Sequence, residues 1–149
     1  MSSQLNVDTI VDKAGSGGTN VKVGNTSTYV SDGGSATQNT VQSLCKVWVN
    51  FNGTGTIAAR DSFNMTSLTD NGTGDYTTTF ANDFSNANYV FLGNSMYENS
   101  RSHVHGQSSN TAYATGSMRG ISAFVAGTNG EDTATDGDIV NRAYLGDLA

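Results

Sequence analysis

The amino-acid sequence predicts an all-β protein, in which a short N-terminal β segment precedes an antiparallel β-sandwich or jelly-roll-like domain. Gly, Ser, Thr and Asn make up 70 of the 149 residues, and there is no proline. Thr packs well on a pleated surface, whereas Gly and Asn tolerate the positive φ of tight turns. Only two glutamates occur, and no window shows apolar residues at the three- and four-residue spacing of an amphipathic helix. We therefore expect strands joined by tight turns and very little helix.

Residues 1–43 are predicted to form a separate N-terminal segment of small strands and a neck. Apolar residues and Thr alternate along Leu5–Val11, and the glycine-rich segment 14–18 ends this strand. Two further short strands are expected at 21–23 and 28–30, and the polar segment 35–43 has the composition of a linker. Strands this short cannot bury a core of their own. We expect them to pair between subunits or to dock on a larger body.

Residues 44–149 are predicted to form the β-sandwich domain, and its clearest strand follows Leu44. Cys45, Val47, Val49 and Phe51 fall on one face of this strand, and the other face carries Lys46, Trp48 and Asn50. Cys45 is the single cysteine, and its place on the apolar face predicts a buried structural thiol. Trp48 lies opposite this face, so a neighbouring subunit is expected to cover it.

Further strands are expected at turn-punctuated spacing through the rest of the chain. The turn Asp70–Asp75 contains Asn-Gly, a strong hairpin signal. Seven or eight short strands at this spacing are typical of a sandwich or jelly roll. The expected segments are Thr56–Arg60, Phe63–Thr69, Tyr76–Phe80, Asn88–Tyr97, Thr111–Thr115, Gly120–Ala126 and Ile139–Leu145.

Charge and hydropathy exclude several classes of function. The net charge is −6, and the seven Lys and Arg residues are scattered singly, so no basic stripe exists that would neutralise a phosphate backbone. No segment is apolar enough to be a signal peptide or to span a bilayer, so we expect assembly in a cytoplasm without membrane insertion. The hydrophobic content of 36% is lean for a monomer of this size, which favours a homo-oligomer.

A family resemblance supports a structural or adhesive role. The segment Lys46–Phe80, which reads KVWVNFNGTGTIAARDSFNMTSLTDNGTGDYTTTF and continues through Asn86–Val90, resembles a module near the carboxyl ends of bacteriophage tail-fibre-like proteins, particularly those of marine phages. The opening LNVDTIVDKAG also looks like a repeated element of such virion proteins. The resemblance covers about two fifths of the chain and implies no known ligand residues.

The resemblance implies a non-enzymatic virion protein that assembles in the bacterial host cytoplasm. We expect a homotrimer that attaches to other virion proteins through an N-terminal strand, with Leu5, Val7, Ile10 and Val11 as the attachment residues. The C-terminal domain would then be displayed toward a glycan or protein of the host surface. The alternative is a capsid-decorating, cement or head-fibre protein, which the shortness of the N-terminal segment favours.

No catalytic constellation is recognised, and the expected cofactor set is empty. There is no nucleophile elbow, phosphate loop or zincin helix. His103 and His105, two apart on an expected strand or loop, would gather six imidazoles around a transition metal if they faced a threefold axis, and a solvated loop is the alternative. The acidic segment Asn129–Asp138 offers oxygen ligands for calcium but lacks the EF-hand spacing, so a solvated turn is the alternative.

Ligand contacts are expected in the loops between Met96 and Asp138, where Tyr97, Arg101 and Tyr113 are the candidate contact residues. Aromatic side chains would stack on sugar faces wherever they are exposed, although most are expected in the core or at an interface. The aromatic candidates for such stacking are Trp48, Tyr76, Tyr89, Phe91, Tyr97 and Tyr113.

Overall fold

A computed structural model describes residues 27–30, 37–97, 101–107, 113–126 and 131–149. These residues form strands and turns and no helix, which confirms the expected all-β class with antiparallel pairing. Accordingly, this part of the chain contains no helix long and apolar enough to cross a membrane. The chain divides into two compact units, Met1–Val41 and Gln42–Ala149.

The first unit contains a small antiparallel hairpin of β1 (Thr28–Val30) and β2 (Thr37–Asn39). At the open end of the hairpin, the backbone N–H and the hydroxyl of Thr40 both donate to the carbonyl of Ser27. The β1 strand was expected from the sequence, but β2 lies in the segment predicted to be a linker. Its polar residues form a strand because they pair with β1, a contact that composition does not reveal. The strands expected at 5–11 and 21–23 lie outside the described residues.

The second unit is one ten-stranded antiparallel sheet. Its main path runs in the order β4-β3-β12-β7-β8-β10-β6-β5, and β9 and β11 both pair with β10. The strands, in chain order, are β3 (Cys45–Asn52), β4 (Ala58–Phe63), β5 (Met65–Gly72), β6 (Asp75–Phe80), β7 (Val90–Tyr97), β8 (Arg101–Gln107), β9 (Tyr113–Ala114), β10 (Ser117–Ala126), β11 (Glu131–Ala134) and β12 (Ile139–Leu145).

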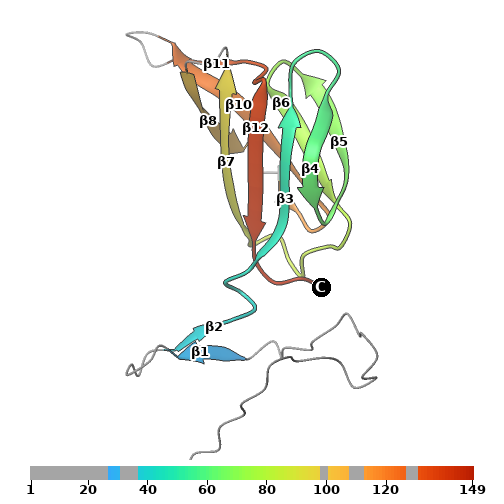
Figure 1. Ribbon diagram of the computed structural model, residues 1–149, viewed down its shortest axis with the longest axis vertical. Coiled ribbons are helices and arrows are strands. Elements are labelled where there is room, and N and C mark those ends of the chain that lie inside the picture. The colour runs from blue at the N-terminus through green and yellow to red at the C-terminus, as the bar shows by residue number, and fades with distance from the viewer. Residues whose placement is uncertain (1–26, 31–36, 98–100, 108–112, 127–130) are drawn as a thin grey trace, which may run out of the picture. The chain divides into compact units, whose positions relative to one another are not determined.

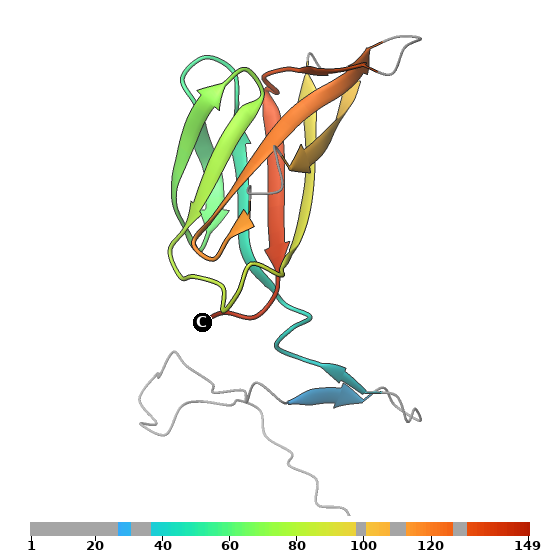
Figure 2. The same cartoon turned by 180° about the vertical axis from the view of Figure 1, so that it is seen from behind.

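This sheet folds over into a sandwich-like arrangement of two layers. Figure 1 shows β7, β12 and β3 side by side in one layer, and Figure 2 shows β10, β6 and β5 of the other layer from behind. Alternate residues of β3 and β6 are buried between the layers, which is the expected period of two. The core of the unit therefore lies between the two folded halves of a single sheet.

A single residue, Asn64, joins β4 to β5, which are the two end strands of the sheet path. Its φ of 55° lies in the left-handed region, which Asn tolerates better than most residues. The side chain holds the corner: its amide N–H donates to the carbonyl of Lys46 at 3.1 Å, and its oxygen accepts from the backbone and side chain of Asn82. The strand predicted at Phe63–Thr69 is therefore wrong at its first two residues, because Phe63 ends β4, Asn64 forms the corner and β5 begins at Met65.

Two strands of the second unit lie outside the strand segments expected from the sequence. The β8 strand carries the His103-Val-His105 triplet, and β11 lies in the acidic segment predicted to be a turn or a calcium loop. Both are polar, and both pair with the ten-residue strand β10, which also pairs with β6 and β9: β8 pairs with Gly120–Ala123 of β10, and β11 pairs with Ala123–Ala126. Backbone pairing with a long neighbour thus makes strands of segments that have no apolar alternation.

The core consists of two apolar clusters. One contains Val47, Phe80, Phe84, Tyr89, Met118 and Tyr144, and the other contains Val49, Phe51, Tyr76 and Val140. Aromatic rings pack edge to face within them, such as Phe80 against Tyr144 with centroids 4.9 Å apart. Tyr76 in the second cluster packs against Phe51 at 5.2 Å. Such aromatic pairs add to the stabilisation from burial alone.

A buried arginine lies between these clusters. Arg142 is 2% exposed and falls between Val140 and Tyr144 on the inner face of β12. Its Nη1 donates to the carbonyl of Tyr76 at 2.9 Å and to the hydroxyl of Thr78 at 3.3 Å, and its Nη2 donates to the carbonyl of Gly120 at 2.8 Å. The guanidinium also lies 5.5 Å from the centroid of the Phe51 ring. Within the described structure, its charge is therefore compensated by neutral carbonyls, a hydroxyl and ring faces, and no carboxylate accepts a hydrogen bond from it.

The start of β3 departs from the expected pattern. Cys45 is exposed rather than buried, and its thiol lies 3.2 Å from the carbonyl of Val47. The pairing of β3 with β12 shifts at this point, where Leu145 pairs with Cys45. Lys46, expected on the open face, is only 6% exposed and donates to the carbonyl of Leu44. The alternation holds from Val47 onward and fails at the irregularity, which the sequence does not signal.

Candidate functional site

One apolar row crosses the outer face of β4, β3, β12 and β7. The register pairs Phe63 with Trp48, Trp48 with Ala143, and Ala143 with Leu92. Residues paired in this way on antiparallel strands lie on the same face of the sheet. Phe63 and Leu92 are each 55% exposed, and Trp48 is 37% exposed. We call these four residues the tryptophan row.

A row of amides lies directly beside the tryptophan row, two residues along each strand. Asn50 donates to the side-chain oxygen of Asn141 at 2.6 Å, and Asn141 donates to that of Asn94 at 2.9 Å. These three residues, which we call the asparagine ladder, are paired across β3, β12 and β7. Asp61 on β4 pairs with Asn50 and extends the row by one carboxylate. Apolar and amide rows thus run parallel on one face.

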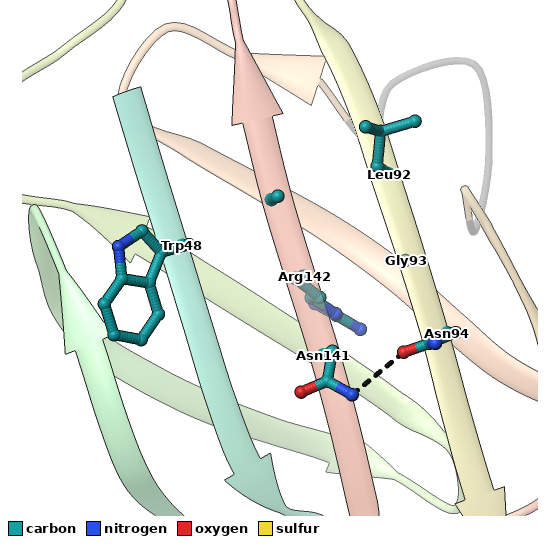
Figure 3. A pocket seen from close by; sticks show the side chains of 7 residues that line it. Trp48, Leu92, Gly93, Asn94, Asn141 and Arg142 are labelled. Atoms are coloured by element: carbon teal, nitrogen blue, oxygen red, sulfur yellow. Dashed lines mark hydrogen bonds between the residues drawn. The ribbon is translucent and has the colours of Figure 1, made fainter. Parts of the chain in front are cut away.

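A hollow of about 410 Å³ opens where the two rows meet. Figure 3 shows Trp48 on β3 at one side of the hollow, Leu92 and Asn94 on β7 at the other, and Asn141 between them on β12. Ala143 occupies the position between Trp48 and Leu92 in the tryptophan row, and its small side chain leaves the depression open. The hollow is therefore walled by apolar side chains along one row and by amides along the other.

The hollow has no accessible positive charge among the side chains that line it. Arg142 is its only charged lining residue, and the guanidinium lies in the core with the hydrogen bonds described above. Burial lowers the pKa of Arg142 from its usual value. Asp61 is the charged group at the end of the amide row, and its carboxylate accepts from the backbone N–H of Ser62. The electrostatic environment of the face is therefore neutral to weakly negative.

The two candidate metal ligands lie on β8. The backbone pairs His103 with Ser95 of β7 and His105 with Ser122 of β10. The imidazoles lie outside the described part of the structure, so metal binding stays a prediction. Among the side chains that are described, no group of three His, Cys, Asp or Glu residues is placed to hold a metal ion.

The remaining candidates fall in different places. Tyr97 and Arg101 pair with each other at the end of β7 and β8, and their side chains lie outside the described residues. Tyr113 on β9 packs against Tyr89 at a centroid distance of 4.9 Å, at the margin of the core. Leu5, Val7, Ile10 and Val11, the expected attachment residues, also lie outside the described part of the chain.

One carboxylate of the acidic segment before β12, that of Asp136, has a structural role. Asp136 accepts hydrogen bonds from the hydroxyl of Tyr76 and from the backbone N–H of Gly74, both at 2.7 Å. Together with burial, this contact raises the pKa of Tyr76. Asp136 thus fastens the β5–β6 turn to the segment that precedes β12.

Sequence reasoning placed Trp48 and Asn50 on the face opposite the core but missed Leu92, Asn94 and Asn141. A signal was present, because Trp48 precedes Asn50 by two residues just as Leu92 precedes Asn94. In β12, which runs antiparallel to both, the order is reversed and Asn141 precedes Ala143. Recognising these three pairs as two continuous rows requires the strand order.

Comparison of the chain with protein-family models, with curated proteins and with solved structures finds no significant match.

Proposed function

We propose that this chain is a non-enzymatic, tail-fibre-like structural protein of a bacteriophage virion. In this proposal, the first 43 residues attach it to the particle and the C-terminal domain is displayed for adhesion to the host surface. The resemblance of Lys46–Phe80 to a module of such proteins supports the virion location. We further propose that the chain is a homotrimer and that the sandwich-like domain is jelly-roll-like.

The observation that carries the adhesive part of this proposal is the outer face of β4, β3, β12 and β7. Large apolar side chains on this face remain more than one third exposed in the described structure. A large contiguous patch of exposed apolar surface that is bordered by polar residues usually marks an interaction site. The exposed side-chain amides of the asparagine ladder allow the same face to form hydrogen bonds with a ligand.

Weak binding by one copy is sufficient for this role. When several copies are held on one particle, the second and later binding events occur at a high effective concentration. The overall avidity then exceeds the affinity of a single domain by orders of magnitude. A shallow binding face is therefore compatible with firm attachment.

The test locates the chain on intact particles. Particles that carry this chain are labelled with an antibody against the C-terminal domain and imaged by electron cryo-microscopy, and the copy number is measured by quantitative mass spectrometry. Label on the tail, in threefold bundles and at low copy number, is the expected result. Label spread over the capsid lattice at high copy number would refute the tail-fibre proposal and make decoration of the shell the function.

A further inference from the structure

We infer that the hollow between the tryptophan row and the asparagine ladder binds one ring of a neutral saccharide. The inference rests on the adhesive function proposed above and names the chemical class of its ligand. It assigns a role to Trp48, Asn94 and Asn141, three side chains whose polar atoms contribute no contact to the core.

The first argument is the shape and mixed character of the hollow. Its volume of about 410 Å³ lies within the range of roughly 300–1,000 Å³ that is usual for small-molecule sites. Neighbouring strands are about 4.8 Å apart, so β3 and β7, with β12 between them, are separated by about 10 Å. A pyranose ring fits this width. One face of such a ring presents C–H groups, which the negative face of an indole attracts.

The second argument is the hydrogen-bonding inventory of the asparagine ladder. Each internal bond uses one N–H, so Asn50 and Asn141 each keep one N–H without a partner among the described residues, and Asn94 keeps two. At the opposite end, the oxygen of Asn50 accepts no hydrogen bond from any described residue. The ladder is thus a donor at β7 and an acceptor at β3. Adjacent hydroxyls of a sugar, which both donate and accept, match this arrangement.

The third argument is charge. No cation among the lining residues reaches the hollow, because the guanidinium of Arg142 is turned into the core. Asp61 stands at the acceptor end of the ladder, and the whole chain carries a net charge of −6. An anionic saccharide would therefore be repelled, whereas a neutral one is unaffected.

The same features argue against a second copy of this chain as the occupant. A permanent protein interface has an apolar, fully desolvated centre, and charged or polar groups buried in it need partners. Here the amide N–H groups that have no partner in the described part of the chain lie immediately beside the apolar row. A flat apolar surface from a second copy would bury these donors without partners, but a polyhydroxylated ligand would pair them.

The experiment uses the full chain labelled with ¹⁵N and titrated with neutral methyl glycosides of glucose, galactose, mannose and N-acetylglucosamine. Trp48 is the only tryptophan, so the single indole N–H resonance and the intrinsic tryptophan fluorescence both report on this site alone. We expect saturable shifts of the indole resonance and of the Asn94 and Asn141 side-chain amides with at least one glycoside. The methyl glycoside of glucuronic acid is expected to bind at least threefold more weakly than its neutral counterpart.

Matched variants separate the site from the rest of the face. Trp48→Ala and Asn141→Ala are expected to weaken binding at least tenfold. Phe63→Ala removes an exposed aromatic from the same row but not from the lining of the hollow, and Asn71→Ala removes an amide bonded to Thr77 on the other layer. Both controls are expected to bind as the unchanged chain does, and all four variants are checked for native amide dispersion before titration.

Three results would overturn the inference. The first is the absence of any saturable shift with every glycoside, and the second is equal weakening by Phe63→Ala and Trp48→Ala. The third is concentration-dependent self-association that Trp48→Ala abolishes, because the hollow would then belong to an interface between copies. Failure of this inference is distinct from failure of the proposed function: tail location without saccharide binding refutes the ligand alone, and saccharide binding by a chain found on the capsid lattice refutes the location alone.

Discussion

Replacement of Arg142 tests whether a guanidinium fork, rather than a positive charge, holds the two core clusters together. In Arg142→Lys the charge stays buried, but one ammonium cannot reach acceptors on both β6 and β10. In Arg142→Met the charge and its hydrogen bonds disappear together, and a side chain of similar length fills the space. We therefore expect the lysine variant to be less stable than the methionine variant, although lysine is the more similar residue.

The magnitudes follow from the contacts. Arg142 makes three hydrogen bonds to neutral acceptors, and bonds that involve a charged partner contribute about 1.5–3 kcal/mol each. Lysine loses about two of them and keeps the unfavourable burial of charge, so its free energy of unfolding should fall by about 3 kcal/mol. Methionine loses the bonds but also relieves the desolvation, which leaves a loss of about 1 kcal/mol.

The assay is urea denaturation of the full chain followed by tryptophan fluorescence, with thermal melting as a second measurement. For a domain of this size the expected decreases in Tm are about 15 °C for lysine and about 5 °C for methionine. Arg119→Lys is the matched control, since Arg119 is exposed and paired with Asp75, and its midpoint should stay close to that of the unchanged chain. A lysine variant as stable as the methionine variant, or more stable, would refute the reasoning.

Three other features give independent predictions. Asn64→Ala should lower the free energy of unfolding, measured in urea, by about 2 kcal/mol, because alanine is strained at a left-handed φ and cannot form the corner hydrogen bonds. Asn64→Gly loses the hydrogen bonds without the strain and should lower it by about 1 kcal/mol. A glycine variant less stable than the alanine variant would contradict the strain argument. Burial raises the pKa of Tyr76, Tyr89 and Tyr144 above the unfolded value of about 10, so their contribution to stability is complete below about pH 10 and is lost as pH rises toward the folded values. Urea midpoints should fall above about pH 10, and tyrosinate absorbance from these residues should appear only with unfolding; its appearance in the folded chain would count against the burial. Cys45 should react with a thiol reagent in the native chain at a rate close to that of the unfolded chain, and strong native protection would contradict its exposure.

The alternation of apolar residues predicted the strands that form the centre of the fold. Ile139–Leu145 was expected as a strand and is β12, and the strand after Leu44 is β3. Both pack one face against the core, so burial imposes the period of two that the sequence displays. The predicted turn segment Asp70–Asp75 likewise contains the β5–β6 turn, but the two turn residues are Thr73 and Gly74, because Asn71 and Gly72 still belong to β5.

The features that escaped prediction depend on contacts between distant segments. β8 is a strand because it pairs with β7 and β10, β11 is a strand because it pairs with β10, and Asn64 turns a corner inside what reads as one strand. Arg142 follows the same principle: it was not predicted to be buried, and the acceptors that compensate its charge come from β6 and β10. The binding face required the strand order, which places Leu92 and Asn94 two strands away from Trp48.

The position of Arg142 also bears on how the chain avoids misfolding. In a β protein rich in Thr and Val, the easiest error is a slip of two residues, because it keeps every side chain on its proper face. A slip of β12 by two residues would place the guanidinium among the aromatic rings of one cluster and would leave the carbonyls of Tyr76 and Gly120 opposite an apolar side chain. The buried arginine therefore favours the native register of β12. We expect Arg142→Met to refold to a mixture of two registers, with doubled amide resonances along β12. A single set of native resonances would show that the apolar clusters select the alignment without it.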